Sequence, residues 1–125
     1  MTINSNSIYK EHILELYRHP KNFGSLEKPT HKAHEHNSLC GDEIIIEVKV
    51  ANGKIDEIKF NGQGCAISIA ATSMLTEKIK GIEVEKALKL SKEELLDELK
   101  IPISYARLKC VLISIDTLKK ALEKK

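Results

Sequence analysis

Apolar and polar positions alternate in the first half of this chain of 125 residues, and the spacing changes in the second half. Residues 42–50 are rich in β-branched side chains, and residues 55–60 alternate between apolar and polar. A period of two is typical of a β-strand with one buried face. Asn52 and Gly53, between these runs, both tolerate a positive φ, which favours a tight hairpin turn. The pattern predicts two antiparallel strands, with the polar residues 28–37 as either a loop or a weak edge strand.

Helical spacing of apolar residues appears before and after the predicted strands. Ser7 is placed to cap the first of these helices, and Pro20 disfavours helix at the residue before it. Gly81 is suited to end the second helix, and Ser91 opens a capping box for the third. The predicted helices cover residues 8–18, 66–80, 92–99 and 105–123.

The order of these elements predicts the fold class. Strands followed by a run of helices favour an α+β architecture, in which helices pack on one face of a small antiparallel sheet. We expect three strands, with Ile67, Ile69, Met74 and Leu75 in the core. The length favours a single domain over residues 1–125.

Composition narrows the possible partners. Hydrophobic residues make up 42% of the chain and charged residues 30%, with a net charge of +2. This balance excludes a disordered chain and argues against a nucleic-acid or membrane partner. No stretch resembles a signal peptide or a membrane span. Three cysteines, an odd number, favour free thiols in a reducing compartment, so we expect a cytoplasmic protein.

The three cysteines lie next to features that suit metal or sulfur chemistry. Cys40 and Asp42 flank a glycine just before a predicted strand. Cys65 stands at the start of a helix, where backbone N–H groups and the helix dipole favour a thiolate. Cys110 follows Arg107 by one helical turn. If these segments converge, three sulfurs and one carboxylate surround a single metal position.

Such a ligand set selects a thiophilic metal, either iron in a sulfide cluster or zinc. A carboxylate is a weaker ligand than a thiolate for cluster iron, so Asp42 would make the site easier to empty. The chain has no Cys-x-x-Cys pair, however. From the residues alone, three unrelated buried cysteines are an equally good interpretation.

The histidines offer weaker alternatives. His34 and His36 would share a strand face and could bind zinc together with a distant cysteine, but exposed histidines on an edge strand are the favoured interpretation. A Cys–His hydrolase would need an oriented third group, and no motif supplies one.

Three segments resemble the cysteine motifs of the IscU/NifU-type iron–sulfur cluster scaffolds. They are Cys40-Gly41-Asp42, Gly62-Gln63-Gly64-Cys65 and Arg107-Leu108-Lys109-Cys110, in that order. The segment from Tyr17 to Gly24, Tyr-Arg-His-Pro-Lys-Asn-Phe-Gly, is also similar to the N-terminal part of that family.

The resemblance implies a SufE/NifU-like fold and a role in binding and release rather than in turnover of a substrate. Sulfur from a cysteine desulfurase and ferrous iron would combine into a [2Fe–2S] cluster, which then passes to apoproteins. By position, Cys40, Asp42, Cys65 and Cys110 would be the ligands. Cys110 would accept the persulfide sulfur.

Two departures from the scaffolds closest to IscU leave the subtype open between IscU and SufU. Lys109 stands where scaffolds closest to IscU have a histidine, and Ile101-Pro102-Ile103-Ser104-Tyr105 replaces a Leu-Pro-Pro-Val-Lys segment that a dedicated chaperone recognises. Arg107 and Lys109 are more similar to SufU, a zinc-bound sulfur acceptor, although SufU carries an extra segment between the second and third cysteines. The alternative function is therefore a zinc-bound sulfurtransferase accessory, in which Cys110 or Cys40 leaves the metal to accept sulfur.

Overall fold

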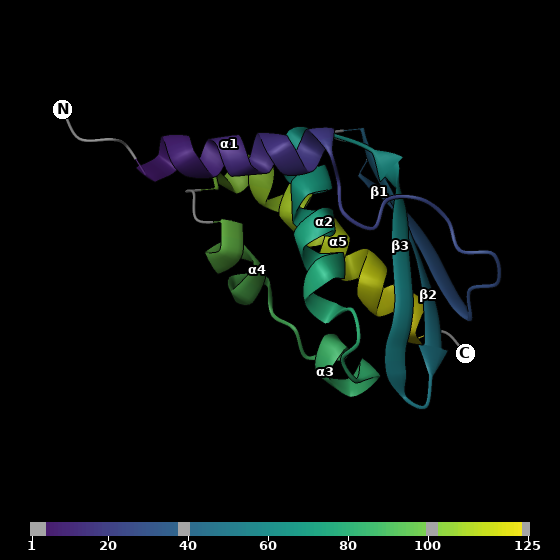
Figure 1. Ribbon diagram of the computed structural model, residues 1–125. Helices are drawn as coiled ribbons and strands as arrows, with labels where there is room; N and C mark the ends of the chain where they lie inside the picture. Colours follow the sequence, from purple (N-terminus) through teal and green to yellow (C-terminus); the bar gives the residue numbers. More distant parts are fainter. Residues whose placement is uncertain (1–4, 38–40, 100–102, 124–125) are drawn as a thin grey trace.

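A computed structural model describes residues 5–37, 41–99 and 103–123 of the chain (Figure 1). Over these residues the fold has two layers, a β-sheet and a layer of helices. The elements in chain order are α1 (Ser5–Arg18), β1 (His31–Asn37), β2 (Asp42–Ala51), β3 (Lys54–Gln63), α2 (Ala66–Ile79), α3 (Val84–Leu88), α4 (Lys92–Leu99) and α5 (Tyr105–Glu123).

The sheet has three antiparallel strands, as predicted, and their order is β1-β2-β3. Asn52 and Gly53 have φ values of 55° and 74°, so the hairpin turn uses the left-handed conformation that both residues tolerate. The polar residues 31–37 form the edge strand β1. Alternate side chains of β1 face the helices. Ala33 is buried there, and Glu35 pairs with Lys120 of α5 at 2.9 Å, so these contacts hold the polar segment in the sheet.

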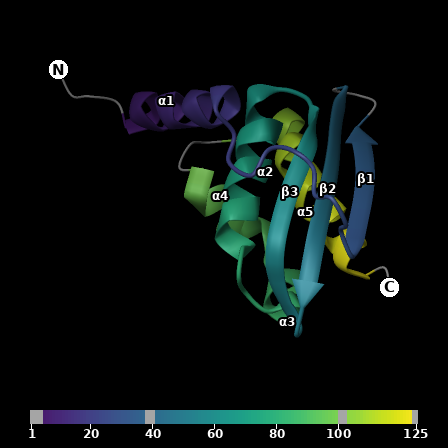
Figure 2. The ribbon, with the colours of Figure 1, turned by 45° about the vertical axis from the view of Figure 1, so that its right-hand side comes forward.

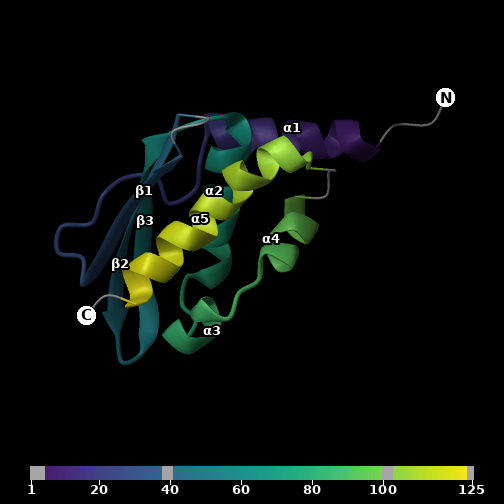
Figure 3. The same ribbon diagram turned by 180° about the vertical axis from the view of Figure 1, so that it is seen from behind.

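Helices cover one face of the sheet, which confirms the predicted architecture. α5 lies against β1 and β2, and α2 lies against β3, as Figure 3 shows from behind. α1 packs against α2, and α4 packs against both α2 and α5. The largest fully buried side chains include Ile44, Ile46, Val48, Phe60, Leu75, Leu95, Leu99 and Leu118.

The helix boundaries agree with the sequence pattern except near the N-terminus and at one short helix. α1 begins at Ser5, so Ser7 lies inside the helix and the predicted cap is wrong. A serine near the start of a helix lowers the stability of the helix only slightly, so the helix can extend beyond Ser7 toward the N-terminus. α3 was not predicted, because five residues are too few to show a helical period. The Ser91 cap is confirmed, since the Glu94 N–H donates to its Oγ at 3.2 Å.

The segment between α1 and β1 crosses the sheet on the face away from the helices (Figure 2). Gly24 N–H donates to the Phe60 carbonyl, and Phe60 N–H donates to the Asn22 carbonyl, both at 2.8 Å. Further along, Leu26 N–H donates to the Glu47 carboxylate at 2.7 Å. This segment therefore pairs with the outer edge of β3 and fixes the position of the end of α1. No helix among the described residues is long and apolar enough to cross a membrane.

Candidate metal centre

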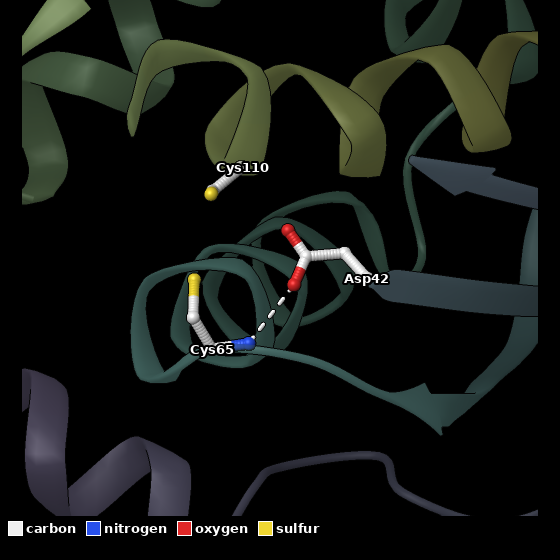
Figure 4. A group of neighbouring side chains, drawn as sticks. All are labelled: Asp42, Cys65 and Cys110. Atoms are coloured by element: carbon white, nitrogen blue, oxygen red, sulfur yellow. Dashed lines mark hydrogen bonds between the residues drawn. The ribbon is translucent and has the colours of Figure 1, made fainter. Parts of the chain in front are cut away.

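Three of the four predicted ligands meet at one end of the molecule (Figure 4). Asp42 is the first residue of β2, Cys65 is the N-cap residue of α2, and Cys110 lies in the second turn of α5. One ligand atom from each of the three lies within 4.8 Å of the others. Cys40 lies outside the described residues. Three segments that are far apart in sequence thus form a group that can hold a metal ion.

The Asp42 carboxylate is fully buried, and only one of its oxygens is satisfied. Oδ1 accepts a hydrogen bond from the Cys65 N–H at 2.9 Å. Oδ2 is buried without a hydrogen-bond partner among the described residues, and Figure 4 shows it directed toward Cys110. A buried charged oxygen without a partner is costly. A cation bound between this oxygen and the two sulfurs would remove that cost, so the residues fit a thiophilic metal.

Two glycines before Cys65 leave the space that this arrangement needs. Gly62 has a φ of 135°, and a Cβ at this position would collide with the backbone carbonyl of Glu43. A Cβ on Gly64 would lie 2.5 Å from both Asp42 Oδ1 and Ser68 Oγ. Gly62 therefore lets β3 pass close to β2, while Gly64 lets the carboxylate lie under the start of α2.

Gly64→Ala is expected to damage the site more than the fold. The backbone at Gly64 suits an L-residue, so the added methyl displaces the side chains of Asp42 and Ser68 rather than straining the chain. We expect zinc affinity, measured by competition with a chromogenic chelator, to fall roughly ten- to a hundredfold, as it does when the groups that orient a ligand are lost. Gly64→Ala combined with Ser68→Ala removes one of the two collisions and should recover part of the affinity. Unchanged zinc affinity in Gly64→Ala would contradict this packing argument.

The charges at the site favour a bound cation. Burial raises the pKa of the Cys110 thiol, and the neighbouring Cys65 and Asp42 raise it further. The pKa of Arg107 is raised, mainly by the charge of Cys65 and hydrogen bonding to it, and then by Cys110. Arg107 is exposed to solvent.

Comparison with known proteins identifies the family of the chain. The family model for the NifU-like N-terminal domain matches residues 8–124. The chain belongs to this family. The IscU scaffold protein of Thermotoga maritima is 37% identical over an alignment 133 positions long, which covers 94% of each chain. The zinc-dependent sulfurtransferase SufU of Bacillus subtilis is 37% identical over 94 residues, covering 74% of this chain and 63% of SufU.

A solved structure also matches over most of the chain. It is a protein from Fervidobacterium islandicum, described as an iron–sulfur cluster assembly scaffold for the SUF system. It superposes with a TM-score of 0.77 at 28% identity and covers 95% of this chain and 99% of its own. The three-stranded sheet covered by helices is therefore the fold of the family.

Two basic residues near the third cysteine occupy different places. Arg107 lies close enough to Cys65 and Cys110 for both to raise its pKa, whereas Lys109 is exposed and lines a cleft of about 440 Å³ between β1 and α5 with Glu35 and Asp116. The sequence places Arg107 one turn from Cys110, but only the fold shows that it also reaches Cys65. Among the described residues, no histidine joins the group of Asp42, Cys65 and Cys110.

Arg107→Ala is expected to slow alkylation of Cys65 by iodoacetamide in the metal-free protein. Removing the positive charge disfavours the reactive thiolate, and for an exposed charge we expect a roughly two- to fivefold decrease in rate. Mass spectrometry of the cysteine peptides separates the three thiols. Lys109→Ala removes the same charge two residues away and should leave the rate unchanged. Equal rates in the two variants would contradict the assignment of Arg107 to the sulfurs.

Proposed function

We propose that this protein is an iron–sulfur cluster assembly scaffold. It receives sulfur from a cysteine desulfurase and iron from solution, assembles a [2Fe–2S] cluster, and transfers the cluster to apoproteins. The observation that carries this proposal is the convergence of Asp42, Cys65 and Cys110 around a buried carboxylate oxygen without a partner. The family membership of residues 8–124 supports it.

The cluster is the cargo, and the chain supplies its ligands. We assign Cys65, Cys110 and Asp42 to three positions around it, and Cys40, two residues before Asp42 in the sequence, to the fourth. Thiolates bind iron strongly, whereas a carboxylate is a harder and weaker ligand. The Asp42 bond is therefore the one that opens first when an acceptor protein offers its own thiolate.

Sulfur arrives as a persulfide on the desulfurase. We assign Cys110 as the acceptor: its thiolate attacks the outer sulfur, the S–S bond breaks, and the desulfurase leaves as a thiolate. The new persulfide then needs two electrons from an external donor to release sulfide. Cys110 is fully buried and Cys65 is half-buried, so this assignment requires side chains around Cys110, such as that of Arg107, to move during transfer.

Transfer of the cluster to an acceptor tests the scaffold role. Protein reconstituted anaerobically is mixed with an apo-ferredoxin, and circular dichroism in the visible range follows the cluster as its environment changes. We expect the cluster to pass to the ferredoxin faster than free iron and sulfide assemble on it. A cluster that reaches the ferredoxin no faster than that background would argue against a scaffold.

A zinc-bound sulfurtransferase is the second candidate. The position of Arg107 beside both sulfurs favours it, because a cation there can stabilise a thiolate that has left a metal. In this function zinc occupies the same four residues, and Cys110 or Cys40 leaves it to accept sulfur. The 37% identity to SufU supports it.

The remaining expectations form part of the same proposal. The chain acts as one assembly domain over residues 1–125, in the cytoplasm, with a cysteine desulfurase and apoprotein acceptors as partners and with no nucleic-acid or membrane partner. In the scaffold function it binds and releases without catalysing a reaction. In the second function it is a sulfurtransferase.

A further inference from the structure

Three side chains that can ligate a metal also gather on the face of the sheet away from the helices. Ala33 and Glu35 of β1 face α5, so His34 and His36, each one position further along the strand, face the opposite side. On β2, Ile44 is buried against the helices and its neighbour Glu43 faces outward. The two histidines and Glu43 therefore share one face, and β1 and β2 lie side by side in Figure 2.

The strand register brings these three residues together. His36 and Glu43 are direct partners across the antiparallel pair, and such partners have Cβ atoms about 4.5–5.5 Å apart. His34 lies diagonally across from Glu43, and its Nε2 is 2.7 Å from Glu43 Oε2. One carboxylate thus lies within reach of two imidazoles that are spaced two residues apart on one strand.

A small cleft borders this face. It has a volume of about 220 Å³, and the residues that line it include His36 and Glu43 together with Gly41 and Asp42. His34 and Glu43 are 49% and 38% exposed, so solvent reaches both groups. An ion held by them would be open to water and free to exchange.

We propose that His34, His36 and Glu43 form a second, exchangeable site for a divalent transition-metal ion. Imidazole and carboxylate ligands suit Zn²⁺, Fe²⁺ and Co²⁺, and two histidines with one carboxylate leave further positions for water. The ion takes the place of the hydrogen bond between His34 Nε2 and Glu43 Oε2, and a rotation of the exposed His36 side chain completes the set. Binding of the ion here does not depend on the assembly role proposed above.

Cobalt is the probe, because its absorption distinguishes the two kinds of ligand. In the native chain with the cysteine site first filled by Zn²⁺, added Co²⁺ is expected to bind at about one ion per chain. Its weak visible bands should appear without the intense thiolate-to-cobalt charge-transfer bands. A variant with Cys40, Cys65 and Cys110 all replaced by serine should bind Co²⁺ in the same way, provided that its circular dichroism shows it to be folded.

Matched histidine variants assign the ion to its ligands. His34→Ala with His36→Ala should weaken Co²⁺ binding at least about tenfold, because losing ligands costs no less than losing the groups that orient them. Glu43→Gln, which keeps the shape of the side chain, should also weaken it. His31→Ala removes a histidine of the same strand that faces the other side, and it should have no effect. Absence of bound cobalt in the zinc-filled chain, or equal affinity in the His31→Ala and double-histidine variants, would overturn the proposal.

Discussion

Cys110→Ser is expected to abolish persulfide capture from a cysteine desulfurase while the fold remains intact. Serine is close in size to cysteine, and its hydroxyl can donate to the buried Asp42 oxygen that has no partner in the described part of the chain, so the buried position is preserved. Its hydroxyl cannot carry sulfane sulfur. Incubation with the desulfurase and cysteine, followed by mass spectrometry of the intact chain, should show an adduct of one or more sulfur atoms on the native protein and essentially none on the variant.

Cys65→Ser is the matched control for this experiment. Cys65 is the more exposed of the two described thiols, so accessibility alone would make it the acceptor. We expect Cys65→Ser to retain the adduct. A full sulfur adduct on the Cys110→Ser chain, or its loss only from the Cys65→Ser chain, would reject Cys110 as the acceptor. Circular dichroism and the melting temperature establish that each variant is folded.

Asp42→Ala is expected to slow loss of a reconstituted cluster to an acceptor by roughly tenfold, which corresponds to about 1.4 kcal/mol in the barrier. Two physical effects act together. The weakest bond to the cluster is absent, and a small thiol of the buffer takes the free position with a stronger bond to iron. The site also carries one buried negative charge less, so the cluster and its thiolates are repelled less. The measurement is the rate of transfer to an apo-ferredoxin.

Asp56→Ala provides the control for the Asp42 variant, since it removes an exposed acid beyond the hairpin turn. Its transfer rate should equal that of the native chain. Faster loss of the cluster from Asp42→Ala than from the native chain would contradict the view that Asp42 makes the site labile. In that case the carboxylate would be a ligand that retains the cluster.

The sequence predicts the local elements well where the apolar period extends over many residues or where the turn residues strongly favour one turn type. The β2–β3 hairpin follows from alternation and from Asn52-Gly53, and α5 has the bounds that its apolar spacing indicates. The edge strand β1 could not be separated from a loop, because its residues are polar. What holds it is the pairing with β2, the next strand along the chain, and the contact of Glu35 with Lys120 of α5, which is distant in sequence.

The candidate site illustrates the same limit. The cysteine motifs indicate which residues belong together, but spacing alone leaves them equally compatible with unrelated buried thiols. Convergence depends on how α2 and α5 pack against the start of β2, and this packing also brings Arg107 to Cys65. The role of Gly64 depends on the same packing, since its neighbours Asp42 and Ser68 come from different elements. The Cys40 prediction falls outside the described residues and stays a prediction.

Anaerobic reconstitution tests the central claim most directly. The native chain is incubated with cysteine, a cysteine desulfurase and ferrous iron, and is then examined by visible absorption and by analysis of iron, sulfide and zinc. A scaffold should develop sulfide-to-iron charge-transfer bands, with iron and sulfide bound in equal amounts. A colourless protein that keeps one tightly bound zinc ion and raises the turnover of the desulfurase would contradict the scaffold function and favour a sulfurtransferase.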